Sequence, residues 1–98
     1  MDLATLEHQL KCWHEKKYGK GNLNAPKTMR KLGEEFGEFM EAVMYGSPSC
    51  IAEEAADVLF VMTHVVRYYC GPGALDDAVA AKLLVIHNRL LEGPENLQ

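Results

Sequence analysis

Two stretches decide the fold: KLGEEFGEFMEAVMY at residues 31–45 and IAEEAADVLFVMTHVV at residues 51–66. Both repeat apolar residues at intervals of three and four, which is the period of an α-helix. Gly46 follows the first stretch, and Ser47 with Pro48 is typical of the start of a new helix. The sequence therefore predicts two consecutive helices whose connection is so short that they lie antiparallel.

Two more helices flank this pair. The first begins after Asp2 and ends before Gly19, and its apolar stripe consists of Leu3, Leu6, Leu10 and Trp13. We expect Trp13 to pack in the core with that stripe. The last begins near Asp76 or Asp77 and ends at Gly93, and its apolar stripe consists of Val79, Leu83, Ile86 and Leu90. No segment alternates with period two, so we predict an all-α fold, with residues 1–98 as a single domain.

The expected architecture is an antiparallel four-helix bundle that oligomerisation completes. From Ala55 to Val66 only Asp57, Thr63 and His64 are polar, so this helix is apolar around most of its circumference. Such a helix needs cover on more than one side, which one small bundle cannot easily supply. We therefore expect a homodimer or homotetramer with this helix at the interface, and a hydrogen-bonded His64 there.

Composition restricts the class of protein. The 98 residues carry a formal net charge of −4, which argues against nucleic-acid binding. Cys12, Cys50 and Cys70 are odd in number and widely spaced, so we expect small buried thiols in a reducing compartment. No basic and apolar leader is visible, and the longest apolar run is too short to span a membrane. We expect a cytoplasmic protein without a membrane partner.

Two acidic clusters are the strongest functional signal. Glu35 precedes Glu38 by three residues, and Glu54 precedes Asp57 by the same interval. Residues at this spacing are neighbours on a helix surface, so antiparallel helices can turn all four carboxylates toward one another. Clustered hard oxygen ligands favour Mg²⁺ or Mn²⁺. A bound cation would also let an acidic protein hold a phosphate substrate.

Other interpretations compete with a metal site. A run of Glu such as residues 34–41 is usually a solvated helix face, but the second cluster lies in the most apolar helix of the chain. A di-iron carboxylate bundle needs Glu-x-x-His motifs, and no histidine here has a Glu three residues before it. A non-catalytic helical adaptor with an acidic partner surface needs no metal and remains the alternative function.

The pattern Glu34-Glu35-x-x-Glu38 followed by Glu54-x-x-Asp57 resembles the signature of the all-α, MazG-like nucleoside triphosphate pyrophosphohydrolases. This superfamily includes MazG, the dimeric dUTPases, dCTP pyrophosphatase and phosphoribosyl-ATP pyrophosphohydrolase. The resemblance implies a magnesium-dependent hydrolase that cleaves a (d)NTP between its α and β phosphates into a monophosphate and pyrophosphate. A house-cleaning role in the nucleotide pool is one expectation that follows.

The resemblance also implies roles for individual residues. It assigns metal ligation to Glu35, Glu38, Glu54 and Asp57, and activation of a water molecule to Glu34 or Glu38. The family places Lys and Arg near the triphosphate on the last helix, where this chain has Lys82 and Arg89, although Ile86 replaces the usual Asn. Further substrate contacts are expected from Lys31, His14 and Tyr18, the last two lining a base pocket; Lys31 is equally suited to a salt bridge with Glu35.

The sequence leaves several properties open. It does not distinguish ribose from deoxyribose, one base from another, or a biosynthetic role from house-cleaning. The number of metal ions and the choice between dimer and tetramer are also undetermined.

Overall fold

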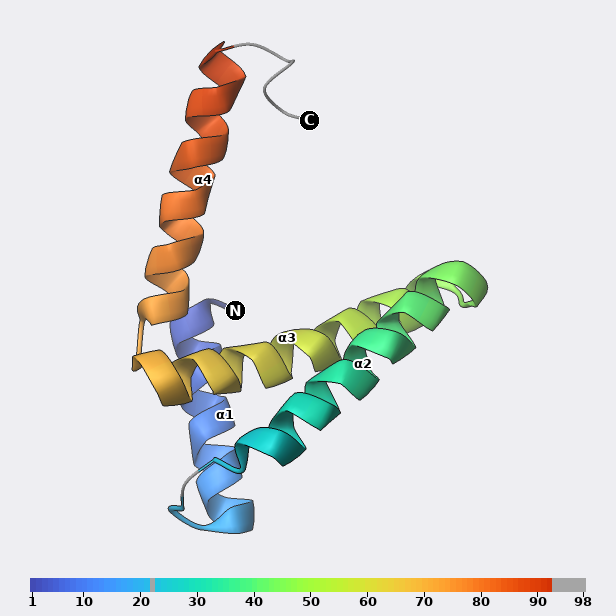
Figure 1. Ribbon diagram of the computed structural model, residues 1–98, viewed down its shortest axis with the longest axis vertical. Coiled ribbons are helices and arrows are strands. Elements are labelled where there is room, and N and C mark those ends of the chain that lie inside the picture. Colours follow the sequence, from blue (N-terminus) through green and yellow to red (C-terminus); the bar gives the residue numbers. More distant parts are fainter. Residues whose placement is uncertain (22, 93–98) are drawn as a thin grey trace.

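The computed structural model describes residues 1–21 and 23–92, which form four α-helices and no strand (Figure 1). The helices are α1 (Leu3–Tyr18), α2 (Ala25–Tyr45), α3 (Pro48–Cys70) and α4 (Ala74–Glu92). The predicted all-α class is confirmed. Among these helices none is long and apolar enough to cross a membrane.

Local capping explains where the first three helices begin. Each cap is a side-chain oxygen that accepts a backbone N–H three residues on: Asp2 from Thr5 at 2.8 Å, Asn24 from Lys27 at 3.1 Å and Ser47 from Cys50 at 3.4 Å. Such caps satisfy N–H groups that the helix itself leaves free. Gly19 and Gly71 end α1 and α3 with φ values of 81° and 89°, which glycine adopts without strain. The sequence also predicts a turn or capping role for Asn22, between α1 and α2, but this residue lies outside the described residues.

The start of α4 depends on a residue far away in the chain. The carboxylate of Glu7 on α1 is buried, and its Oε2 accepts a hydrogen bond from the Gly73 N–H at 3.1 Å. A carboxylate is favourable at a helix N-terminus, where backbone N–H groups are exposed. Helix α4 therefore begins at Ala74, earlier than the Asp76 or Asp77 that local acidity predicts.

The helices form an open arrangement. Helices α2 and α3 lie side by side as an antiparallel hairpin, and α1 crosses the C-terminal half of α3 (Figure 1). Helix α4 contacts α1 and α3 near its own start and then projects away, without contacting α2. Within the described residues α4 has no buried side chain. Its apolar stripe is therefore uncovered in the single chain.

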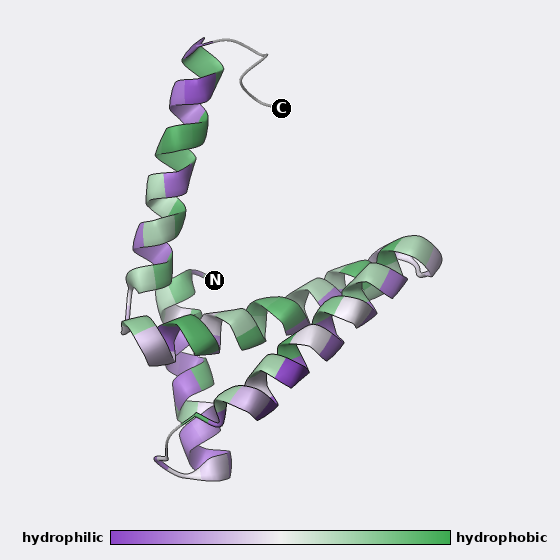
Figure 2. Ribbon diagram, in the orientation of Figure 1, coloured by the Kyte–Doolittle hydropathy of each residue, from purple (hydrophilic) through white to green (hydrophobic). Residues whose placement is uncertain are grey.

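The single chain exposes far more surface than its size requires. Its accessible surface is 7385 Å², whereas a compact protein of this mass exposes roughly 5,600 Å². Its radius of gyration is 16.2 Å, compared with about 12.6 Å for a compact domain of this length. The buried apolar residues among those described are only Leu6, Ala42 and Val58. Figure 2 shows hydrophobic residues along much of α3 and α4.

One side of the α2–α3 hairpin is apolar and exposed. Buried Glu35 and Ala42 mark the side of α2 that faces α3. At 100° per residue, one group of exposed apolar residues of α2 lies a quarter-turn or more from the side that faces α3. A second group, on α3, lies on the same side of the hairpin, because the direction of rotation reverses between antiparallel helices. We call this surface the apolar face; it consists of Met29, Phe36, Met40 and Val43 of α2 with Leu59 and Met62 of α3.

Two predictions about burial are wrong for the single chain. Trp13 is 55% exposed, with the Lys17 Nζ 5.0 Å from its ring centroid, although it lies two helical turns after the buried Leu6 on nearly the same side of α1. All three cysteines are exposed as well. Cys50 and Cys70 lie near the two ends of α3.

Candidate active site

The α2–α3 hairpin brings three of the predicted acids together. One carboxylate oxygen from each of Glu35, Glu38 and Glu54 lies within 4.8 Å of the other two. Glu35 and Glu38 are one turn apart on α2, and Glu54 reaches them from the antiparallel neighbour. We call these three residues the carboxylate cluster. It lies across the hairpin from the apolar face.

The electrostatics of the cluster show an excess of negative charge. Burial raises the pKa of Glu54, and so do the charges of Glu38 and Asp57 and a hydrogen bond with Glu38. Glu35 is buried and pairs with Lys31, whose Nζ lies 2.6 Å from Glu35 Oε1. That contact raises the pKa of Lys31. One lysine thus opposes three carboxylates.

Two oxygens in the cluster lack a partner. Glu35 Oε2 and Glu54 Oε2 are both buried without a hydrogen bond. A buried carboxylate oxygen without a donor or cation is costly, so these atoms are suited to a ligand that brings positive charge. Hard anionic oxygens in such a group fit Mg²⁺ or Mn²⁺ better than softer metals.

The other acids lie at the margin of the cluster. Asp57 is exposed and falls outside the group of three, although its charge is close enough to affect Glu54. Glu34 is exposed on the same helix as Glu35 and Glu38. Both side chains therefore lie where solvent or a substrate can reach them.

The structure does not bring the last helix to this site. Lys82 and Arg89 are exposed on α4, which makes no contact with α2 within the described residues. Figure 1 shows α4 pointing away from the hairpin. Any contact between these two side chains and a substrate at the carboxylate cluster of the same chain would need a different placement of α4.

A cluster of aromatic and histidine side chains lies between α1 and α3. The rings of His14 and His64 stack with centroids 4.4 Å apart, and Tyr18 packs on His14 at 5.0 Å. His14 and His64 line a cavity of about 260 Å³, whereas Tyr18 does not. His64 Nε2 is buried without a partner, in contrast to the hydrogen-bonded histidine that the sequence predicts.

Sequence reasoning did not find the basic residues of this cavity. Lys11, Lys20 and Arg67 contribute to its lining. Arg67 follows His64 by three residues, so helical spacing could have placed the two on one face. Lys11 and Lys20 reach the cavity only because α1 and the loop after it pack against α3.

Comparison with known proteins gives one family. The family model described as phosphoribosyl-ATP pyrophosphohydrolase matches residues 1–68. These residues include α1, α2, most of α3 and all of the predicted acids, but not α4. No curated protein and no solved structure matches the chain significantly.

Proposed function

The chain belongs to the phosphoribosyl-ATP pyrophosphohydrolase family, and we therefore propose that it cleaves the bond between the α and β phosphates of a nucleoside triphosphate, or of a larger nucleotide that contains a triphosphate. The family belongs to the MazG-like superfamily that the sequence resembles, so the enzyme is a hydrolase acting on phosphoric anhydrides. The products of the proposed reaction are a nucleoside monophosphate and pyrophosphate. This membership favours an enzyme over the adaptor alternative.

The observation that carries the proposal is the carboxylate cluster. Glu35, Glu38 and Glu54 converge from two helices, and two of their oxygens are buried without partners. We propose that these three residues, with Asp57 beside them, hold Mg²⁺ or Mn²⁺.

The bound cation would neutralise the phosphate oxygens and make an attacking water molecule more acidic. The residues of the chain then have distinct tasks. Glu35 and Glu54, the less exposed pair, fix the position of the cluster. Glu38 and Glu34 are exposed on α2, so either can accept the proton that water loses as its oxygen bonds to phosphorus and the bridging P–O bond breaks. Lys31 is close enough to the cluster for its ammonium to contact a phosphate when it leaves Glu35.

Pyrophosphate release from a panel of nucleotides tests the proposal. The panel contains canonical and modified NTPs, the dNTPs and phosphoribosyl-ATP, each with Mg²⁺ and with EDTA. We expect monophosphate and pyrophosphate from at least one substrate, only when the cation is present. A diphosphate with orthophosphate would refute α–β cleavage, and preference for modified nucleotides would favour house-cleaning over biosynthesis.

Matched substitutions test the carboxylates. Glu38→Gln should abolish turnover with the helical circular dichroism unchanged. Glu53→Gln is the control, because Glu53 precedes Glu54 on an exposed part of α3 and is not in the cluster. A dead Glu53→Gln variant alongside an active Glu38→Gln variant would show that the wrong side of the hairpin has been assigned.

We also propose that the enzyme works as a homodimer or homotetramer. The single chain exposes roughly 1,800 Å² more than a compact protein of its mass, and its exposed hydrophobic residues include those of the apolar face and of the stripe of α4. Two chains that each bury this much would share an interface of about 3,600 Å², within the range of obligate homodimers. A two-fold axis would bury the same surface on both chains.

A further inference from the structure

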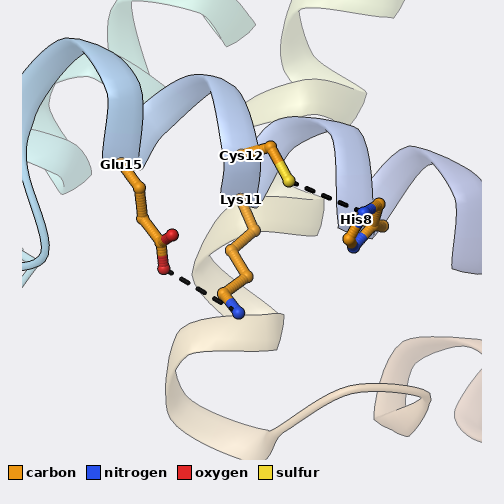
Figure 3. Close-up of polar contacts among 4 residues, drawn as sticks. All are labelled: His8, Lys11, Cys12 and Glu15. Atoms are coloured by element: carbon orange, nitrogen blue, oxygen red, sulfur yellow. Dashed lines mark hydrogen bonds and ion pairs between the residues drawn. The ribbon is translucent and has the colours of Figure 1, made fainter.

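One of the three exposed cysteines lies beside a histidine. On α1 the Sγ of Cys12 and the Nε2 of His8 are 3.6 Å apart, and the two residues are one helical turn from each other along the chain (Figure 3). Neither Cys50 nor Cys70 has a histidine three or four residues away in the sequence. Cysteine sulfur and histidine nitrogen are the atoms that bind zinc most often in proteins. The Cys12 and His8 pair is therefore a candidate metal site of a different kind from the carboxylate cluster.

The distance between the two atoms fits a single zinc ion. Zinc in proteins is usually tetrahedral, with sulfur ligands at about 2.3 Å and histidine nitrogen ligands at about 2.0–2.1 Å. A sulfur and a nitrogen that bind the same ion at the tetrahedral angle are then about 3.6 Å apart. The distance between Cys12 Sγ and His8 Nε2 is 3.6 Å. The pair can thus hold the ion without rearrangement of the helix.

The pair lies on the side of α1 away from its buried residues. At 100° per residue, His8 and Cys12 are about 120–160° from the buried Leu6 on the circumference of the helix. Both side chains are exposed, so an ion can reach them and water can complete its coordination. The nearby acid Glu15 is paired with Lys11, since Glu15 Oε1 lies 3.8 Å from Lys11 Nζ (Figure 3). The site therefore consists of two ligands from the protein.

The ligand types select a different metal from the one expected at the carboxylate cluster. A thiolate and an imidazole suit zinc, whereas hard carboxylate oxygens suit Mg²⁺ or Mn²⁺. The cation that fills the cluster should therefore leave this pair free. Zinc binding at the pair displaces the thiol proton of Cys12 to solvent, because only the thiolate is a ligand.

We propose that His8 and Cys12 form a two-ligand Zn²⁺ site on α1, separate from the carboxylate cluster. The Cys12 thiolate and the neutral His8 imidazole each donate an electron pair to the ion. The bound ion links two successive turns of α1 and stabilises the folded chain, since the unfolded chain does not hold the two ligands together. Zinc binding at this pair does not depend on hydrolysis at the carboxylate cluster.

Cobalt absorption tests the site. Co²⁺ replaces Zn²⁺ in tetrahedral sites, and a sulfur-to-cobalt charge-transfer band appears only when a thiolate binds the ion. With the thiols kept reduced, Co²⁺ should give this band in the wild-type protein, and Zn²⁺ should abolish it by competition. Both ions also bind carboxylates, but the carboxylate cluster has no sulfur and cannot give the band. Cys12→Ser should abolish the band. His8→Gln should weaken Co²⁺ binding by at least about tenfold, since even the loss of an outer partner of a metal ligand costs that much.

Matched variants separate this pair from the other thiols and histidines. Cys50→Ser and Cys70→Ser each remove another exposed thiol, and His87→Gln removes an exposed histidine that has no cysteine within one turn. None of these variants should change the band, and neither should Glu38→Gln. If no band forms, the observed contact is a hydrogen bond only. An unchanged affinity in His8→Gln would show a thiolate acting alone, and a band lost in Cys50→Ser or Cys70→Ser would place the metal elsewhere. Any of these three results would overturn the site.

Discussion

Substituting Met40 by Asp should dissociate the enzyme. Met40 lies in the middle of the apolar face and is 52% exposed in the single chain. Full burial of a methionine side chain is worth about 1.5–3 kcal/mol, so association gains about half of that for each copy. A two-fold interface contains the residue twice, and each new carboxylate adds a desolvation cost of several kcal/mol. The total loss should exceed about 5 kcal/mol, or more than about a thousandfold in Kd.

Sedimentation velocity at low micromolar concentration measures this effect. Wild-type protein should sediment as a dimer or tetramer, and Met40→Asp as a species near the chain mass of 11.0 kDa with a lower melting temperature. Tyr45→Asp is the matched control. Tyr45 is 82% exposed at the end of α2, on the side away from the apolar face. A wild-type enzyme that is active as a single chain, or a Met40→Asp variant that stays assembled, would refute the assignment of the interface.

Three further substitutions test single contacts. The raised pKa of Glu54 means that its ionisation destabilises the cation-free fold. The free energy of unfolding should therefore fall as pH rises from about 4.5 through that pKa. Glu54→Gln should remove both this decline and the stabilisation by Mg²⁺, which melting curves in EDTA and in Mg²⁺ measure. Lys31→Gln should tighten Mg²⁺ binding by up to about fivefold in calorimetry, because it frees the buried Glu35 from its salt bridge with the exposed Lys31. Glu7→Ala should lower the free energy of unfolding by about 1.5–3 kcal/mol through loss of the Gly73 contact, with the Mg²⁺ response unchanged.

Local chemistry made much of the fold predictable. Asn24, Ser47 and the terminal glycines act within one turn of the chain, so their effects can be read from adjacent residues. The start of α4 could not be predicted in this way, because it depends on Glu7, which precedes Gly73 by 66 residues. Amphipathicity likewise reveals that α2 has an apolar side. It does not reveal whether a helix of the same chain or of another chain covers that side.

The candidate site, like the fold, was predictable from the sequence only where it depends on residues close together in the chain. The three-residue spacing within each acidic pair and the short connection between helices were enough to predict convergence of Glu35, Glu38 and Glu54. The displacement of Asp57 from the group depends on how α3 rotates against α2, which side-chain packing decides. The basic cavity depends on where α1 crosses α3. No periodicity within either helix contains that information.

The separation of α4 from α2 leads to a last prediction, that Arg89 acts at the carboxylate cluster of a partner subunit. In one chain α4 points away from the hairpin, yet an oligomer would bring uncovered α4 and hairpin surfaces of different chains together. Glu38→Gln and Arg89→Gln should each impair the homo-oligomer. When the two variants are unfolded together and refolded, mixed dimers should regain activity, because one site then combines an intact Glu38 with an intact Arg89 from the other chain. If both residues act within one chain, every site in the mixture keeps one defect, and mixing restores nothing.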